Sequence, residues 1–339
     1  MSRNENRCKK ILIGGWNQSR KAFFGLVGVA LQAFLYRQVL AQKITITEAT
    51  HTFTSQCILG EGAFWDSNRQ KLWLVDIEGK RFRLFGPETK SDISFATSTR
   101  VGTLVPAYPE NKVVLGLEDG VYEYDLEKQT STKVGTNKKL IPGLRLNDGK
   151  CDPSGQLWVG SMALNEKRKA GQLFRCDKNG KMTVMLDSVS ISNGIAWTRN
   201  GKTMYYIDTP TRKVQAFDYE DSTGKIRNRR VAFSIPDSLG FPDGMTIDQN
   251  DNLWIAMWGG GCVTQWNPTS GKLLGMVKVP VPNVTSCTFG GSRMDILYIT
   301  TARKGLKDKD LLKYPQSGDI FEATPGVRGF QQPYYKLKM

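Results

Sequence analysis

The sequence predicts an all-β fold, a six-bladed β-propeller, and two observations carry this prediction. The first is a short apolar strand that recurs six times after residue 50, with its central residue at positions 73, 114, 158, 205, 254 and 297. The steps between these positions are 41 to 49 residues. The second is a turn and a further strand with alternating aromatic residues, as in residues 121–125 and 214–218. Six β-rich units of this length are typical of propeller blades.

Residues 1–42 precede the first repeat and read as a targeting segment. They contain seven Lys or Arg residues, six of which precede a fifteen-residue run at 22–36. That run is apolar except for one polar residue. That run is short for a bilayer span, which needs about 20 residues. It suits a signal peptide cleaved after residues 39–41. The sequence therefore predicts export to the periplasm or the extracellular space. A retained membrane anchor and a cytoplasmic protein are the alternatives, and a membrane is a partner only if the segment is retained.

The predicted propeller occupies residues 50–325. A propeller ring has to be closed, and a strand at about residues 52–57 can pair with residues 318–321 to complete one blade from both ends of the chain. Residues 304–314 are predicted to contain one turn of helix, and residues 326–339 to form a C-terminal tail. No other window after the N-terminal segment shows helical periodicity.

The net charge does not predict a nucleic-acid partner. The formal charge is +15, but seven Lys or Arg residues against Glu5 place +6 of it in residues 1–42. The remainder is spread along the chain instead of forming the basic patch that nucleic-acid binding requires. One basic cluster, at residues 225–230, is predicted to be a solvated loop.

The supply of histidine and cysteine limits the possible chemistry. The chain has a single histidine, His51, which lies near a predicted edge strand and is expected to be structural or solvated. Five cysteines after residue 42 show no C-x-x-C spacing and are expected to be buried as small hydrophobic residues. A Ser-His-Asp triad or a histidine zinc site would need His51. The chemistry is therefore left to carboxylates, amides and a metal ion.

Each repeat carries a polar residue eleven or twelve positions before its strand centre, usually beside a glycine. The innermost strands of a propeller line its channel, so equivalent positions form a ring at one mouth of the channel. The second and sixth repeats have Thr103 and Thr285 at this position. The sequence predicts that the other four residues converge: Glu61, Asn147, Asn193 and Asp243.

Two carboxylates and two amides, without histidine or cysteine, form an oxygen-only site. Hard cations such as Ca²⁺ prefer carboxylate and amide oxygens. Without a cation, Glu61 and Asp243 would repel each other and one of them would have to stay protonated. The sequence therefore predicts a divalent cation in the central channel, and a polar plug with bound water is the alternative.

Six segments carry distinctive motifs: LGEGAFWD (59–66), RLNDGKCDPSG (145–155), SNGIAW (192–197), YIDT (206–209), PDGM (242–245) and TSCTFGG (285–291). They resemble the SMP-30/gluconolactonase/luciferin-regenerating (regucalcin-like) family. The resemblance runs from about residue 57 to residue 322 and covers all six repeats. It implies a six-bladed propeller that holds one divalent cation, with Ca²⁺ as the first choice and Zn²⁺, Mn²⁺ or Mg²⁺ as alternatives.

The resemblance also implies roles for individual residues. Glu61, Asn193 and Asp243 match the family's metal ligands by position. Arg145 and Asn147 match its substrate-contacting pair, and Asp243 also matches its proposed general base. The implied partner is a small-molecule lactone, and we expect the protein to be a monomer.

The sequence departs from the family pattern after residues 161–162. Vertebrate members carry a longer, acidic loop there that helps to hold a sugar lactone, whereas residues 163–171 of this chain are fewer and basic. Asn165 or Glu166 is the candidate to take over the substrate contact that this loop makes in the vertebrate members. Residues 167–169 (Lys-Arg-Lys) are expected to border the channel mouth and to favour anionic substrates. A solvated loop without substrate contact is the alternative.

These observations together predict a metal-dependent lactonase. The cation polarises the lactone carbonyl, and Asn147 and Asn193 offer amide donors to the developing oxyanion. Arg145 orients the substrate, and Asp243 deprotonates the attacking water. A carboxylate bound to a dication is a weak base, so activation of the water by the metal itself is left open. Two other functions remain: an aryl-ester or phosphotriester hydrolase on a calcium propeller, and a non-catalytic calcium-binding regulatory protein.

Overall fold

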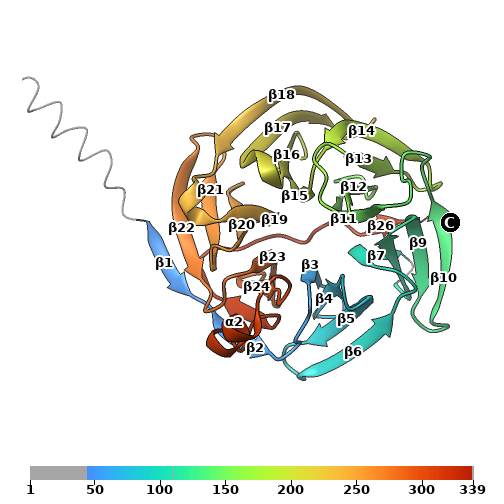
Figure 1. Ribbon diagram of the computed structural model, residues 1–339. Coiled ribbons are helices and arrows are strands. Elements are labelled where there is room, and N and C mark those ends of the chain that lie inside the picture. The colour runs from blue at the N-terminus through green and yellow to red at the C-terminus, as the bar shows by residue number, and fades with distance from the viewer. Residues whose placement is uncertain (1–43, 109, 338–339) are drawn as a thin grey trace, which may run out of the picture. The chain divides into compact units, whose positions relative to one another are not determined.

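Six sheets, each built on four antiparallel strands, stand around a central channel as the blades of a propeller, so the predicted all-β, six-bladed propeller is confirmed (Figure 1). The structure is a computed structural model that describes residues 44–108 and 110–337. The targeting segment predicted for residues 1–42 lies outside these residues. Within them, no helix combines the length and the apolar character that a membrane crossing requires.

In the first three blades the strand that comes first in the chain is the innermost one. Blade 1 comprises β3 (Gly60–Asp66), β4 (Lys71–Asp76), β5 (Arg81–Gly86) and β6 (Ser91–Ala96). Blade 2 comprises β7 (Val101–Tyr108), β8 (Lys112–Leu117), β9 (Gly120–Asp125) and β10 (Thr130–Gly135). Blade 3 comprises β11 (Leu144–Cys151), β12 (Leu157–Ala163), β13 (Gly171–Cys176) and β14 (Met182–Val189).

The other three blades follow the same order, with short helices in their loops. Blade 4 comprises β15 (Ser192–Trp197), β16 (Thr203–Asp208), η1 (Thr209–Thr211), β17 (Lys213–Glu220) and β18 (Lys225–Ser234). Blade 5 follows η2 (Asp237–Leu239) and comprises β19 (Phe241–Ile247), β20 (Leu253–Trp258), β21 (Cys262–Asn267) and β22 (Lys272–Lys278). Blade 6 comprises β23 (Val284–Gly290), β24 (Ile296–Thr301), α2 (Asp308–Lys313), β25 (Ile320–Ala323) and β2 (Thr50–Phe53).

Both ends of the propeller chain meet in blade 6. Strand β2 pairs antiparallel with β25, and His51 lies opposite Phe321. The closure is therefore as predicted, although β2 spans Thr50–Phe53 instead of residues 52–57 and its partner strand spans Ile320–Ala323 instead of residues 318–321. The His51 Nε2 atom lies 3.0 Å from Asp319 Oδ2. The single histidine thus contributes to the joint that closes the ring.

Two further segments add a fifth strand to a blade. Strand β1 (Thr45–Glu48) pairs parallel with β22, and β26 (Tyr335–Lys336) pairs parallel with β7. The segment treated as a C-terminal tail therefore includes a strand. It also crosses the face at which the innermost strands end: Tyr334 Oη donates to Asp66 Oδ1 at 2.7 Å and Lys336 N to Gly155 O at 3.0 Å. In Figure 1 this red stretch runs behind the channel.

A buried aspartate–tryptophan pair recurs in three blades and explains the recurring tryptophans. In each pair the indole Nε1 donates to an aspartate at the end of the innermost strand, and each of these aspartates is fully buried. The bond ties the turn between the first two strands to the blade core. The pairs are Asp66–Trp73 at 3.0 Å, Asp152–Trp158 at 2.9 Å and Asp248–Trp254 at 3.1 Å.

The basic cluster at residues 225–230 is a strand and not the predicted loop. It forms the first part of β18, the outermost strand of blade 4, and most of its side chains are exposed. Arg230 forms an ion pair with Asp218 on the neighbouring strand at 2.7 Å. Edge strands commonly carry charged side chains because these discourage pairing with another chain, so the basic composition did not exclude a strand. The five described cysteines are buried and free, as predicted.

Candidate functional site

Every innermost strand carries an irregularity of the β-bulge type at the position of the predicted polar ring. A bulge breaks the alternation of side chains and re-aims one of them. In blades 1, 3, 4 and 5 the residue beside the shift is one of the predicted site residues. The pairing with the second strand shifts between Glu61 and Phe64, Val101 and Thr103, Leu146 and Gly149, Asn193 and Ile195, Pro242 and Met245, and Val284 and Ser286.

The glycines beside these polar residues are required by the bulges. Gly62 has a φ of +60°, in the left-handed region that favours glycine. A Cβ atom on Gly194 would lie 2.6 Å from the Cβ of Met245, and one on Gly244 would lie 2.8 Å from the carbonyl oxygen of Thr285. Neighbouring innermost strands therefore approach too closely for a side chain at these positions.

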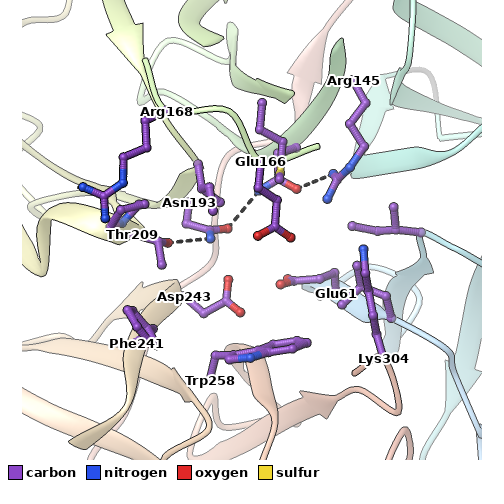
Figure 2. A pocket seen from close by; sticks show the side chains of 16 residues that line it. Glu61, Arg145, Glu166, Arg168, Asn193, Thr209, Phe241, Asp243, Trp258 and Lys304 are labelled. Carbon is purple, nitrogen blue, oxygen red and sulfur yellow. Dashed lines mark hydrogen bonds between the residues drawn. The ribbon is translucent and has the colours of Figure 1, made fainter. Parts of the chain in front are cut away.

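A cavity of about 390 Å³ lies at this mouth of the channel (Figure 2). Its apolar lining includes Phe241 and Trp258. Its polar lining includes Thr209, Glu166, Arg168 and Lys304. The structure also brings to this cavity all five site residues singled out in the sequence, whose individual roles stay predictions: Glu61, Arg145, Asn147, Asn193 and Asp243.

A chain of hydrogen bonds orders the polar side chains along one wall of the cavity. Arg145 Nη1 donates to Asn147 Oδ1, and Asn147 Nδ2 donates to Asn193 Oδ1 at 3.1 Å. Asn193 Nδ2 then donates to Thr209 Oγ1 at 2.8 Å, and Thr209 Oγ1 donates to the carbonyl oxygen of Pro242 at 2.8 Å. Because Asn147 Oδ1 accepts from the arginine, its Nδ2 faces Asn193 Oδ1, and the arginine thereby fixes the orientation of both amides.

This arrangement of hydrogen bonds corrects the expectation that the Asn147 amide donates to the developing oxyanion. Asn147 Nδ2 also donates to the carbonyl oxygen of Ser192 at 2.6 Å. Both of its N–H groups are therefore occupied, and it cannot donate to a developing negative charge in this arrangement. Arg145 keeps its Nε and Nη2 donors, since only Nη1 forms hydrogen bonds among the described residues. Arg145 is thus the better placed donor, and Asn147 orients it.

Glu61 and Asp243 form a buried carboxylate pair, each 6% exposed. Burial, reinforced by the charge of Asp148, raises the pKa of Glu61 to about 8. Burial, followed by the charge of Glu61, raises the pKa of Asp243 well above its ordinary value. Among residues 44–108 and 110–337 neither carboxylate forms an ion pair with a basic side chain. When ionised, the pair therefore carries negative charge that no basic side chain of the described protein neutralises.

The chemistry of this donor set fits a hard cation. Two buried carboxylates and the Asn193 amide oxygen line one cavity, and such oxygens are the preferred ligands of Ca²⁺ and Mg²⁺. A site of three or more His, Cys, Asp or Glu side chains does not occur in the part of the chain that the structure describes. A cation here would therefore depend on the Asn193 amide and on water to complete its coordination.

The raised pKa of Glu61 predicts a pH dependence of stability in the absence of a cation. Because this pKa rises from 4.5 to about 8 on folding, the stabilising contribution is complete below pH 4.5 and is lost as the pH rises through 8. Thermal unfolding in the presence of chelator should therefore show a falling Tm from pH 5 to pH 8.5. The Glu61→Gln variant should lose part of this slope, because burial raises the pKa values of Asp243 and Asp148 as well. An unchanged slope in the variant would show that ionisable groups other than Glu61 cause the pH dependence of Tm.

Several cavity-lining residues were missed in the sequence, among them Thr209, Trp258 and Lys304. Thr209 could have been found, because it directly follows the strand in the YIDT motif (206–209). Lys304 and Trp258 gave no signal, since they stand in or beside loops whose sequences do not repeat between blades. Of the residues proposed to replace the missing acidic loop, Glu166 lines the cavity.

Known proteins resemble this chain over most of its length. Residues 59–303 match the family described as SMP-30/Gluconolactonase/LRE-like region. The protein named "Putative sugar lactone lactonase YvrE" of Bacillus subtilis is 36% identical over 277 residues, which cover 82% of this chain and 94% of that protein. Regucalcin of Oryctolagus cuniculus is 36% identical over 284 residues, which also cover 82% of this chain and 94% of that protein.

A solved structure shares the fold. The calcium-binding protein regucalcin of Agrobacterium tumefaciens matches with a TM-score of 0.82 at 26% identity, over 86% of this chain and 99% of that chain. The family match at residues 59–303 includes all five predicted site residues and the six innermost strands. The chain therefore belongs to the SMP-30/gluconolactonase/LRE-like family.

Proposed function

We propose that this protein is a lactonase that hydrolyses the ring ester of a sugar lactone or a related lactone, with a divalent cation held by Glu61, Asn193 and Asp243. The observation that carries the proposal is the buried, uncompensated carboxylate pair in a cavity of about 390 Å³, beside a buried arginine with free donors. A cavity of this size accommodates a small molecule. The relative named as a sugar lactone lactonase supports the same reaction class.

Ca²⁺ is the proposed cation, and Zn²⁺, Mn²⁺ and Mg²⁺ are the alternatives. The oxygen-only donor set supports a hard cation, and the similar Agrobacterium protein is described as calcium-binding. When bound, the cation supplies Lewis-acid polarisation of the lactone carbonyl.

The protein's own residues bind and orient the substrate and move the proton. Arg145 is 4% exposed, and its Nε and Nη2 groups can donate to substrate oxygens. Burial lowers the pKa of Arg145 to about 10, so it stays charged at neutral pH. Asn147 keeps Arg145 and Asn193 in place through the hydrogen bonds described above.

Asp243 is the proposed general base. It accepts a proton from the attacking water, whose oxygen bonds to the carbonyl carbon. The ring C–O bond then breaks, and the proton passes to the leaving alkoxide to give the open hydroxy acid. Only a carboxylate oxygen of Asp243 that is free of the cation can accept this proton effectively. Phe241 and Trp258 form an apolar part of the cavity lining beside these groups.

A hydrolysis screen tests the proposal. Aldonolactones, aromatic lactones, aryl esters and phosphotriesters are each offered to the purified protein with Ca²⁺ and with chelator. Cation-dependent opening of aldonolactones is the expected result. Preferential cleavage of aryl esters or phosphotriesters would show that the protein is an aryl-ester or phosphotriester hydrolase instead. Thermal stabilisation by Ca²⁺ without hydrolysis of any substrate would indicate a non-catalytic calcium-binding protein.

A further inference from the structure

The cavity is lined by three basic side chains in addition to its carboxylates. Arg145 belongs to β11, Arg168 to the loop between β12 and β13, and Lys304 to the loop after β24. Figure 2 shows Arg168 and Lys304 on opposite sides of the Glu61–Asp243 pair. Of the three consecutive basic residues at 167–169, only Arg168 lines the cavity.

Lys304 is held in place by an ion pair between blades. Its Nζ lies 2.7 Å from Glu78 Oε1, and Arg100 Nε lies 2.8 Å from Glu78 Oε2. The hydrogen bonds from Lys304 and Arg100 outweigh partial burial and lower the pKa of Glu78 to about 2, so Glu78 stays ionised. Lys304 therefore has its charge largely balanced by the protein.

Arg168 differs from Lys304 because its charge has no such partner. No carboxylate in residues 44–108 or 110–337 lies within ion-pair distance of it. The loop that carries it is short and compact: Glu166 N donates to Ala163 O at 2.9 Å, and Lys169 N donates to Ser190 Oγ at 3.2 Å. A loop anchored at these points holds Arg168 at the mouth of the cavity, where a ligand can reach its guanidinium group.

The charges on the cavity wall favour a substrate with one negative charge. Three carboxylates (Glu61, Glu166 and Asp243) oppose three cations (Arg145, Arg168 and Lys304), and Glu78 offsets Lys304. A bound divalent cation favours the ionised form of Glu61 and Asp243, and the sum with the cation in place is then +1. A neutral sugar lactone would leave this excess unbalanced, whereas a lactone that carries a single carboxylate would balance it.

We propose that the substrate is the lactone of a sugar diacid, an aldarolactone, and that Arg168 binds its free carboxylate. This inference rests on the proposed lactonase function and adds the substrate class. The planar guanidinium group matches a carboxylate in a two-point hydrogen bond. Arg168 is thus a specificity-determining residue that a neutral aldonolactone does not use.

A matched pair of substrates tests this proposal. D-Glucaro-1,4-lactone and D-glucono-1,4-lactone differ only in a carboxylate or a hydroxymethyl group at C6. Arg168→Gln should raise KM for the glucarolactone by about tenfold, with kcat nearly unchanged, because the contact is the same in the ground state and the transition state. KM for the gluconolactone should stay within about twofold. Lys167→Gln removes an equal charge from the same loop but outside the cavity, and should leave both KM values within about twofold.

Calorimetry separates this inference from the proposed function. The product D-glucarate should bind the calcium-loaded protein more tightly than D-gluconate, and Arg168→Gln should abolish the difference. Hydrolysis of both lactones with no preference and no effect of Arg168→Gln would overturn the aldarolactone proposal while leaving lactonase activity intact. Absence of hydrolysis with Arg168-dependent binding of glucarate would support the carboxylate site and overturn the lactonase function. Equal effects of Lys167→Gln and Arg168→Gln would show that general electrostatic attraction, and not a specific contact with Arg168, favours the charged substrate.

Discussion

Asp243→Asn should abolish hydrolysis and cation binding together. We expect kcat/KM to fall by about a thousandfold or more, since the variant loses both the proposed base and an anionic ligand of the cation. Wild-type protein at a cation concentration of 100 times Kd should gain about 2.7 kcal/mol of stability, and the variant should gain almost none. Differential scanning fluorimetry with and without Ca²⁺, together with lactone hydrolysis, measures both effects.

The stability of the cation-free variant distinguishes loss of function from loss of fold. Asp243 and Glu61 are both buried, burial raises the pKa of each, and the charge of Glu61 raises the pKa of Asp243 further. Removing one carboxylate relieves their repulsion, so the cation-free variant should be at least as stable as the wild type. Glu166→Gln serves as the control, because it removes an exposed carboxylate from the same cavity and should keep the stabilisation by Ca²⁺. An inactive Asp243→Asn variant that Ca²⁺ still stabilises would show that Asp243 is a base and not a ligand.

Asp152→Ala should produce the largest loss of stability, about 3–5 kcal/mol. Asp152 is fully buried, and its Oδ2 accepts hydrogen bonds from Trp158 Nε1 at 2.9 Å, Arg175 Nε at 3.0 Å and Tyr219 Oη at 2.7 Å. Alanine would leave a guanidinium charge and two buried donors without an acceptor. Urea unfolding should show the loss as a lower midpoint at constant m-value.

Two further variants serve as comparisons for the loss of stability in Asp152→Ala. Asp152→Asn keeps one acceptor oxygen but removes the charge, and should fall between wild type and Asp152→Ala. Asp125→Ala removes a turn aspartate whose carboxylate accepts from the backbone N–H groups of Glu127 and Lys128 and lies 3.9 Å from the exposed Lys128 Nζ, and should cost about 1 kcal/mol or less. A loss below about 1 kcal/mol for Asp152→Ala would show that the aspartate–tryptophan bond does not stabilise the blade.

The fold and the location of the site followed from the sequence because both depend on a repeat. A strand repeated six times at steps of 41 to 49 residues packs its apolar face against copies of itself, and such units form a propeller. The symmetry of a propeller then places equal positions of the repeat at equal heights along the channel. Glu61, Asn147, Asn193 and Asp243 therefore line one cavity although up to 182 residues separate them.

Other features of the site depend on contacts that no repeat contains. The orientation of Asn147 is set by the donor Arg145 on its own strand and by the acceptors Ser192 O and Asn193 Oδ1 in the next blade, so only the tertiary structure shows that its own donors are occupied. The Glu78–Lys304 ion pair joins residues 226 positions apart in two different blades.

Hydrophobic periodicity and equal phase suffice to place backbone segments, and so the sequence predicted the fold class, the ring closure in blade 6 and the convergence of the four ring residues on one cavity. The tertiary structure alone decided which of residues 167–169 enters the cavity, which hydrogen-bond donors stay free and which charges are balanced. The physical reason is that these properties depend on side-chain directions and on partners from other blades. A difference of one residue along a loop or a bulge reverses the direction of a side chain without changing the pattern from which the fold is predicted.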